Sequence, residues 1–162
     1  MLKKETRGHI RWAIRRDLES MLDLESITKD PLTEDDILNN LRQRNVIAKV
    51  LEIREYSQKP ADYYTHGDEE IAGYMIYSLH KEFLVLERLI VDPKHRKKGF
   101  GKQMIEKLIG KLSHHRRIYI EANFYEEYLE VGAFLKKCGF VVGSHVDEEI
   151  TMYYELEPEK EN

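Results

Sequence analysis

Disulfide bonds and membrane spans are both missing from this sequence. Its 162 residues include a single cysteine, Cys138, so no disulfide can form within the chain. Chains without disulfides are typical of reducing compartments, and we therefore expect a cytoplasmic protein. No apolar run approaches the roughly 20 residues that cross a bilayer, so we expect no membrane partner. No repeat or low-complexity linker interrupts the chain, and we expect one domain over residues 1–157 with a polar tail at 158–162.

A strong excess of charge of one sign is also missing. The chain has 26 Lys and Arg against 30 Asp and Glu, for a net charge of −4. This balance does not indicate a nucleic-acid-binding protein, because such proteins usually carry a broad basic surface. His114 and His115 are adjacent and have no partner at a ligand spacing, so we expect no metal site. What remains is a globular, well-solvated protein in which 35% of the residues are charged.

Hydrophobic periodicity predicts a mixed α/β (α+β) fold. Alternating or continuous apolar runs predict strands at 9–14, 45–53, 70–80, 82–91, 117–124, 140–143 and 150–157, and helical spacing predicts helices at 18–27, 34–41, 102–112 and 131–138. Asp17 and Thr33 are the expected caps of the first two helices, and residues 56–68 are expected to form a loop. The order is βααβββαβαββ, with an antiparallel hairpin turning at His80 and Lys81.

Residues 91–108, VDPKHRKKGFGKQMIEKL, carry the clearest chemical signal. A strand ends at Val91, a basic loop passes through Gly99 and Gly101, and an amphipathic helix follows. Helix N-termini present unpaired N–H groups, and glycines let a bulky anion approach the backbone. The lysines and arginines around them suit a ligand with several phosphates. The loop is therefore a predicted phosphate-binding site.

Two common phosphate-binding motifs do not fit this loop. A P-loop requires glycine where Arg96 stands and Ser or Thr where Gln103 stands. The dinucleotide fingerprint requires a third glycine at the position of Met104. The pattern present is R-x-x-G-x-G, at residues 96–101, preceded by LIVDP.

This pattern resembles the acetyl-CoA motif of the GNAT acetyltransferase superfamily, [RQ]-x-x-G-x-[GA]. A second feature of that superfamily, a helix ending in GF, occurs as VGAFLKKCGF at residues 131–140. The predicted order of elements is also the GNAT order, with a mostly antiparallel central sheet flanked by helices. Within the superfamily the chain looks most like the RimI-like N-terminal protein acetyltransferases, because GYMIYSLHKEFLVLERLIVDPKHRKKGFGKQMIEKL is similar to that group.

The resemblance implies transfer of an acetyl group from acetyl-CoA to a primary amine. The implied cofactor-binding residues are Leu89, Ile90, Val91, Arg96, Lys97, Lys98, Gly99, Phe100, Gly101 and Lys102. The N–H groups of residues 96–102 would hold the pyrophosphate, and the strand at Leu89 and Val91 would pair with the pantetheine arm. Proton transfers by a base and an acid would assist the attack and the departure of the thiolate.

This sequence has other residue types at the positions where RimI-like enzymes usually have their catalytic pair. Leu135 stands where these enzymes have a tyrosine, Tyr128 where they have an asparagine, and Asn123 where an ungapped comparison puts their glutamate. One hypothesis is an insertion that gives Glu121 the role of the glutamate and Tyr125 or Tyr128 that of the hydroxyl donor. The second is catalysis mainly by proximity, with water as proton carrier. The third is acyl-CoA binding without transfer.

For Glu121, an ordinary solvent-facing strand residue remains the alternative interpretation. Glu87 is another candidate base, and its structural alternative is a surface charge or an ion pair with Arg88 or another residue. We expect the acceptor to be the α-amine of a protein or peptide, with a small-molecule amine or a lysine side chain as the alternative. We expect a monomer or homodimer with no nucleic-acid partner.

Overall fold

The computed structural model describes residues 4–57, 63–64 and 69–160. The elements are β1 (Lys4–Trp12), α1 (Leu18–Glu25), α2 (Glu34–Leu41), β2 (Val46–Ser57), β3 (Tyr63–Tyr64), β4 (Glu70–Leu79), β5 (Phe83–Val91), α3 (Phe100–Ile109), β6 (Tyr119–Tyr125), α4 (Leu129–Lys137), β7 (Val141–Val146) and β8 (Glu149–Glu155), with short 3₁₀ turns at Arg15–Asp17 and Pro93–His95. The predicted order is confirmed, and the two-residue strand β3 is added to it. Most of the loop expected at residues 56–68 lies outside the described residues.

One mixed sheet runs through the molecule in the order β1-β2-β4-β5-β6-β8-β7, with β3 paired to β2. Only β5 and β6 are parallel, and the other neighbours are antiparallel. The hairpin between β4 and β5 turns as predicted, since the His80 N–H donates to the Phe83 carbonyl over 2.9 Å. The parallel pair requires a crossover, and α3 supplies it.

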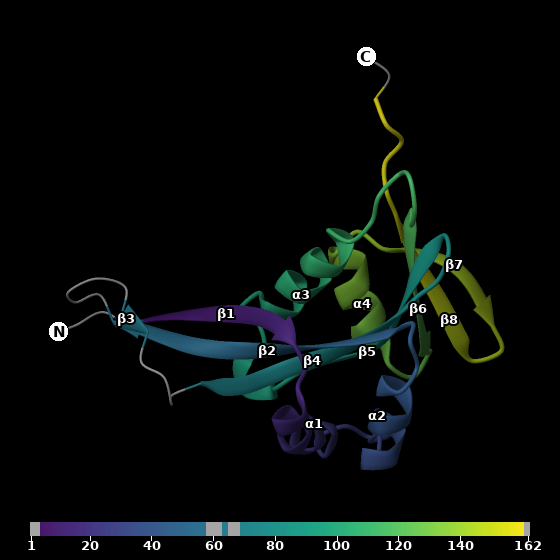
Figure 1. Ribbon diagram of the computed structural model, residues 1–162. Helices are drawn as coiled ribbons and strands as arrows, with labels where there is room; N and C mark the ends of the chain where they lie inside the picture. The colour runs from purple at the N-terminus through teal and green to yellow at the C-terminus, as the bar shows by residue number, and fades with distance from the viewer. Residues whose placement is uncertain (1–3, 58–62, 65–68, 161–162) are drawn as a thin grey trace.

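Helices cover both faces of the sheet, α1 and α2 on one side and α3 and α4 on the other (Figure 1). The core on the α3 side includes Leu51, Met75, Leu86, Met104 and Leu135. The smaller core on the α1 and α2 side includes Met21, Ile37, Val50, Tyr74 and Ile90. β4 is central and buried on both faces, which explains why its sequence is apolar almost without alternation.

The beginnings of the first two helices differ from each other. Thr33 accepts a hydrogen bond from the Asp36 N–H over 3.1 Å, and Asp36 accepts one from the Thr33 N–H over 2.8 Å, so the predicted cap is a full capping box. The prediction that Asp17 caps α1 was wrong. Its carboxylate instead accepts hydrogen bonds from both terminal nitrogens of Arg11 and from the Ile14 N–H. No helix in the described part of the chain has the length and apolar character to cross a membrane.

Candidate active site

Strands β5 and β6 separate from each other partway along their length. They pair only over Phe83–Leu86 and Tyr119–Ala122. Beyond that point, residues 88–91 pair with β4 and residues 123–125 pair with β8. Within the described ranges, no strand pairs with residues 87–91 on the β6 side. Unpaired main-chain groups along such an edge can bind an extended ligand as an added strand.

A β-bulge lies where the two strands begin to separate. Ile76 pairs with Arg88 and Tyr77 with Leu86, so Glu87 is an extra residue in β5. A bulge bends its strand and changes the direction of the side chains next to it. The bend in β5 therefore coincides with the opening between β5 and β6.

Both bulge residues point to the face covered by α1 and α2. Glu87 accepts a hydrogen bond from the Ser78 hydroxyl over 2.8 Å, and Ser78 is also 3.0 Å from Nε2 of His80. Arg88 binds Glu25 on α1. The proposed ion pair between Glu87 and Arg88 is thus not formed, because each side chain has another partner. Among the described residues, no group of three or more His, Cys, Asp or Glu side chains is placed to hold a metal ion.

The loop between β5 and α3 presents its backbone N–H groups to solvent. Lys97 and Gly99 adopt positive φ angles of 62° and 82°. None of the N–H groups of residues 97–102 has a hydrogen-bond partner in the described part of the chain. They include the free N–H groups of the first turn of α3, at the positive end of its dipole. A side chain at Gly99 would meet nothing within 4 Å, so the loop is open at this position. This arrangement fits a pyrophosphate.

Contacts within the chain hold this loop in place. Asp92 accepts a hydrogen bond from the Lys94 N–H over 3.0 Å, and Lys94 and His95 both contact the carboxylate of Glu70 at 3.2 Å. Nε of Arg96 donates to the Val91 carbonyl over 3.1 Å. The arginine of the motif therefore ties the loop to the end of β5.

Gly101 has a different role from Gly99. A Cβ atom at Gly101 would lie 3.1 Å and 3.2 Å from two ring atoms of Phe134 on α4. Contacts this short are strained, so the glycine lets α4 pack against the first turn of α3. The first glycine of the motif serves loop conformation and access, and the second serves helix packing.

The predicted cofactor-binding residues lie together, but they do not all offer side chains. Leu89 and Val91 pack on the α3 side, next to the opening between the strands. The side chain of Ile90 is buried against the α1 and α2 core, and that of Phe100 is buried beside His95. Ile90 and Phe100 can therefore serve a ligand only through their backbone. Lysines of the loop and first turn are exposed: Lys97, Lys98 and Lys102.

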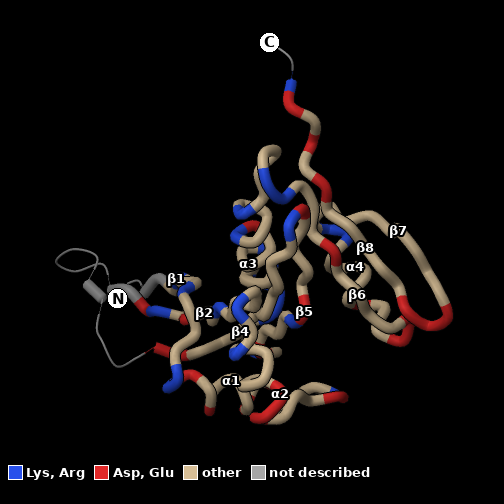
Figure 2. Tube along the Cα trace, turned by 45° about the vertical axis from the view of Figure 1, so that its right-hand side comes forward, with Lys and Arg blue, Asp and Glu red and all other residues tan. Residues whose placement is uncertain are grey.

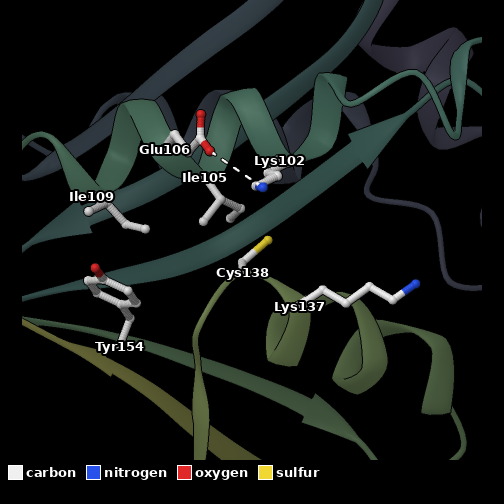
Figure 3. A pocket seen from close by; sticks show the side chains of 7 residues that line it. All are labelled: Lys102, Ile105, Glu106, Ile109, Lys137, Cys138 and Tyr154. Atoms are coloured by element: carbon white, nitrogen blue, oxygen red, sulfur yellow. Dashed lines mark ion pairs between the residues drawn. The ribbon is translucent and has the colours of Figure 1, made fainter.

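A cavity of about 260 Å³ lies beside this loop, between α3 and the end of α4 (Figure 3). Its lining consists of Lys102, Ile105, Glu106, Ile109, Lys137, Cys138 and Tyr154. Lys102 also pairs with Glu106 at 4.0 Å. Burial raises the pKa of the Cys138 thiol, which keeps it protonated and unreactive at neutral pH. The cysteine thus serves as a small packing residue at the cavity wall.

The predicted catalytic residues lie on β6 and in the segment that follows it. Glu121 pairs with Val85 in β5 and with Tyr153 in β8, and alternation along β6 places it opposite the core residues Ile120 and Ala122. It therefore lies on the same face as Glu87.

The two tyrosines are placed differently. The Tyr128 hydroxyl donates a hydrogen bond of 2.5 Å to Asp30 in the α1–α2 loop. This bond raises the pKa of Tyr128, so the hydroxyl remains a proton donor. Lys29 and Glu127, the neighbours of this pair, form an ion pair at 2.9 Å. Tyr125 is exposed at the end of β6.

Other residue types stand at the positions of the usual RimI-like catalytic residues. Leu135 is 2% exposed and packs in the core, so no hydroxyl can act from there. Asn123 accepts a hydrogen bond from the Thr151 hydroxyl over 2.7 Å. Neither can act as an acid or a base at neutral pH.

Sequence reasoning missed the network that joins α1 to β5. Glu25 is 1% exposed and binds Arg88, the Tyr74 hydroxyl and the Leu32 N–H. Burial raises the pKa of Glu25, but these hydrogen bonds outweigh burial and lower it overall. Arg88 also donates to the Asp30 carbonyl over 3.1 Å. No sequence signal identifies this network, because its members lie on separate elements.

Comparison with known proteins agrees with this geometry. The family model described as "Acetyltransferase (GNAT) family" matches residues 19–140. A comparison with curated protein sequences gave no match. The protein is an acetyltransferase of the GNAT family, a family whose members take the acetyl group from acetyl-CoA and transfer it to an amine.

Solved structures share the fold over nearly the whole chain. The ribosomal-protein-S18-alanine N-acetyltransferase from Escherichia coli has a TM-score of 0.73 at 17% identity, covering 96% of this chain and 98% of that one. Ard1 from Thermoplasma volcanium has a TM-score of 0.69 at 17% identity, covering 93% and 99%. A spermidine N-acetyltransferase SpeG chimera from Vibrio cholerae and hSSAT has a TM-score of 0.64 at 15% identity, covering 91% and 95%. Identities this low show a common fold and leave the acceptor open.

Proposed function

We propose that this protein acetylates the α-amine of a protein or peptide N-terminus, using acetyl-CoA and the RimI-like arrangement suggested by its sequence. The observation that carries the proposal is the opening between β5 and β6 beside the start of α3. An edge without a strand partner and a set of six free N–H groups, at residues 97–102, meet there. Acetyl-CoA carries an activated thioester at one end of an extended arm and a pyrophosphate at the other end. The open strand edge suits the arm, and the free N–H groups suit the pyrophosphate.

The free N–H groups and the open strand edge support the following cofactor-binding roles. The loop N–H groups and the positive end of α3 hold the pyrophosphate, and Lys97, Lys98 and Lys102 add charge. Residues 89–91 pair with the extended arm along the free side of β5. These contacts fix the thioester at the bulge, where the acceptor can approach from the opposite face.

The proton-transfer roles use residues on the α1 and α2 face. We assign the base to Glu121, which accepts the proton that an ammonium must lose before its nitrogen attacks. We assign the acid to Tyr128, whose hydroxyl is held by Asp30 and carries the proton that a departing thiolate needs. Tyr125 is the weaker choice, because it is 57% exposed. Glu87 at the bulge is the second candidate base.

The test is acetyl transfer by the purified protein. Acetyl-CoA is incubated with peptides whose N-terminus is free, with the same peptides blocked at the N-terminus but carrying lysine, and with spermidine. We expect a mass increase of one acetyl group on the free N-terminus, localised by fragment-ion masses. Acetylation of spermidine or lysine alone would contradict the peptide acceptor. Tight acetyl-CoA binding without transfer to any amine would indicate a non-catalytic acyl-CoA-binding module instead.

The cellular setting is proposed on separate grounds. A single half-buried cysteine suits a reducing compartment, and we propose that the protein works in the cytoplasm. We further propose a monomer or a homodimer, to be distinguished by light scattering. The fraction, monomer or dimer, that retains acetyl-transfer activity would identify the functional oligomeric state.

A further inference from the structure

A row of four rings crosses the sheet next to Glu121. His80 stacks on Phe83 with ring centres 4.6 Å apart, and Phe83 stacks on Tyr119 at 5.0 Å. Tyr119 meets Tyr153 edge to face at 5.8 Å. The rings come from the β4–β5 turn and from β5, β6 and β8, and the register places them on the face opposite the α3-side core. α1 and α2 lie under β2, β4 and β5 on this side, and β6, β7 and β8 extend beyond them (Figure 1).

Carboxylates without cationic partners flank this row. The side-chain carboxylates of Glu121 and Glu82 form no hydrogen bond or ion pair with any described residue, and among these residues the Glu87 carboxylate binds only the neutral Ser78 hydroxyl. Glu121 is only partly exposed, so water screens its charge less than that of a fully exposed carboxylate. Burial raises the pKa of Tyr119, and the charges of Glu121, Tyr153 and Glu82 raise it further.

The charge at the other end of the row has the opposite sign. Arg117 donates from Nε to the His80 carbonyl over 2.6 Å. A cation on the row should therefore lie on Tyr119, near Glu121 and Glu82, and not on the His80 ring. Figure 2 shows further acidic residues at α2 and at the tip of the β7–β8 hairpin, on either side of this face. The hairpin tip includes Asp147, Glu148 and Glu149.

We propose that this row is a specificity subsite for an acceptor N-terminus with an arginine or lysine among its first residues. The reacting amine lies at Glu121 by the opening, and the aliphatic part of the basic side chain lies on Tyr119 and Phe83. Its charged end lies near Glu82. Aromatic faces attract both methylene groups and cations, and unpaired carboxylates complete the charge match. The proposal rests on the proposed peptide acetylation and adds the sequence class of the acceptor.

The experiment compares peptides that differ at one residue. Otherwise identical peptides carry arginine, citrulline or glutamate at the first, second or third position. Arginine is used because its guanidinium cannot be acetylated like a lysine amine, and citrulline keeps its shape without its charge. We expect kcat/KM for the arginine peptide to exceed that of the citrulline peptide by about 10-fold at one position, the value of one partly desolvated cation contact. The glutamate peptide should be the poorest acceptor.

Variants connect this preference to the row. Glu82→Gln should reduce the arginine-to-citrulline ratio toward one, and Tyr119→Leu should reduce it in the same direction. Glu130→Gln, an exposed carboxylate on α4, should leave the ratio unchanged. Circular dichroism and the acetyl-CoA dissociation constant show that each variant is folded.

The outcomes separate this proposal from the proposed function. If all peptides are acetylated equally, or if Glu82→Gln leaves the ratio intact, the subsite is wrong and peptide acetylation stands. If no peptide is acetylated, the proposed function itself is wrong. If spermidine is acetylated in place of every peptide, the peptide acceptor is wrong in both proposals.

Discussion

Arg88 on β5 and Glu25 on α1 form a two-point ion pair, with Nε–Oε1 and Nη2–Oε2 distances of 3.0 Å and 2.5 Å. Arg88 directly follows the bulge residue Glu87, and its guanidinium also reaches the Asp30 carbonyl. One side chain thus connects the bulge in β5 to the α1–α2 loop that carries the partner of Tyr128. The two strands of the proposed active site and its flanking loop are held as one unit.

Breaking this pair should destabilise the protein. Glu25→Gln leaves Arg88 without a counter-charge in a mostly buried position, and we expect a loss of about 3 kcal/mol in the free energy of unfolding. Urea denaturation followed by circular dichroism measures it. Glu19→Gln, at an exposed position of the same helix, is the matched control and should change stability by less than about 0.5 kcal/mol. Equal effects of the two variants would contradict the role of the pair.

The same carboxylate should make stability depend on pH. The pKa of Glu25 is lower in the folded protein than in the unfolded chain, so its contribution is fully present above the unfolded value of about 4.5. The contribution is lost as pH falls through the lower, folded pKa. The difference in unfolding free energy between the natural protein and Glu25→Gln should therefore be constant from pH 7 to 5 and shrink below pH 4.5. A constant difference down to pH 2 would exclude this linkage.

Substitution of Gly99 should impair acetyl-CoA binding more than folding. Gly99→Glu places an anion in the open space before the free N–H groups, and we expect the dissociation constant measured by calorimetry to rise by about 100-fold. Gly99→Ala carries only the cost of a left-handed residue, about 1 kcal/mol of stability. Gly110→Ala, at the right-handed end of the same helix, is the control for both. Unchanged affinity in Gly99→Glu would place the pyrophosphate elsewhere.

Substitution of Gly101 should act through packing instead. The added methyl group of Gly101→Ala presses on the Phe134 ring, and we expect a loss of about 1–2 kcal/mol in stability. Phe134→Leu removes the ring edge, so the double variant should lose less than the sum of the two single variants. Strict additivity in urea denaturation would show that the ring is not the cause.

The assignment of Tyr128 can be separated from a purely structural role. Removing a proton donor from the reaction typically lowers kcat by about 100-fold, and we expect this for Tyr128→Phe with little change in acetyl-CoA affinity. Asp30→Asn keeps the hydroxyl but weakens its hydrogen bond, so its effect on kcat should be much smaller. If both variants lower kcat equally and only slightly, the Tyr128–Asp30 hydrogen bond serves only to connect the two loops.

The two candidate bases are compared in the same assay. Glu121→Gln should lower kcat by about 100-fold, and the loss should be largest below the pKa of the acceptor amine, where a proton must be removed. Glu87→Gln should have a smaller effect, because Ser78 already occupies its carboxylate. A larger loss in Glu87→Gln would move the base from β6 to the bulge.

The sequence by itself predicted the parts of this protein that depend on neighbouring residues. Periodicity gave the order of elements, and Thr33 with Asp36 gave a helix start. The loop motif predicted a backbone suited to phosphate, because positive φ at Gly99 and free N–H groups at a helix start are local properties. Asp17 shows the limit of such patterns, since a distant Arg11 in β1 competes for the same carboxylate.

Only the tertiary structure decided which side chains meet at the opening. Glu25 and Arg88 are 63 residues apart, and Tyr128 and Asp30 are 98 apart. Their contacts depend on the strand order and on the bulge at Glu87, and no local pattern encodes either. The loop could therefore be predicted from its own residues as a candidate acetyl-CoA site. The acceptor side could not, because it is assembled from α1, β5, β6 and β8 only when the sheet is complete.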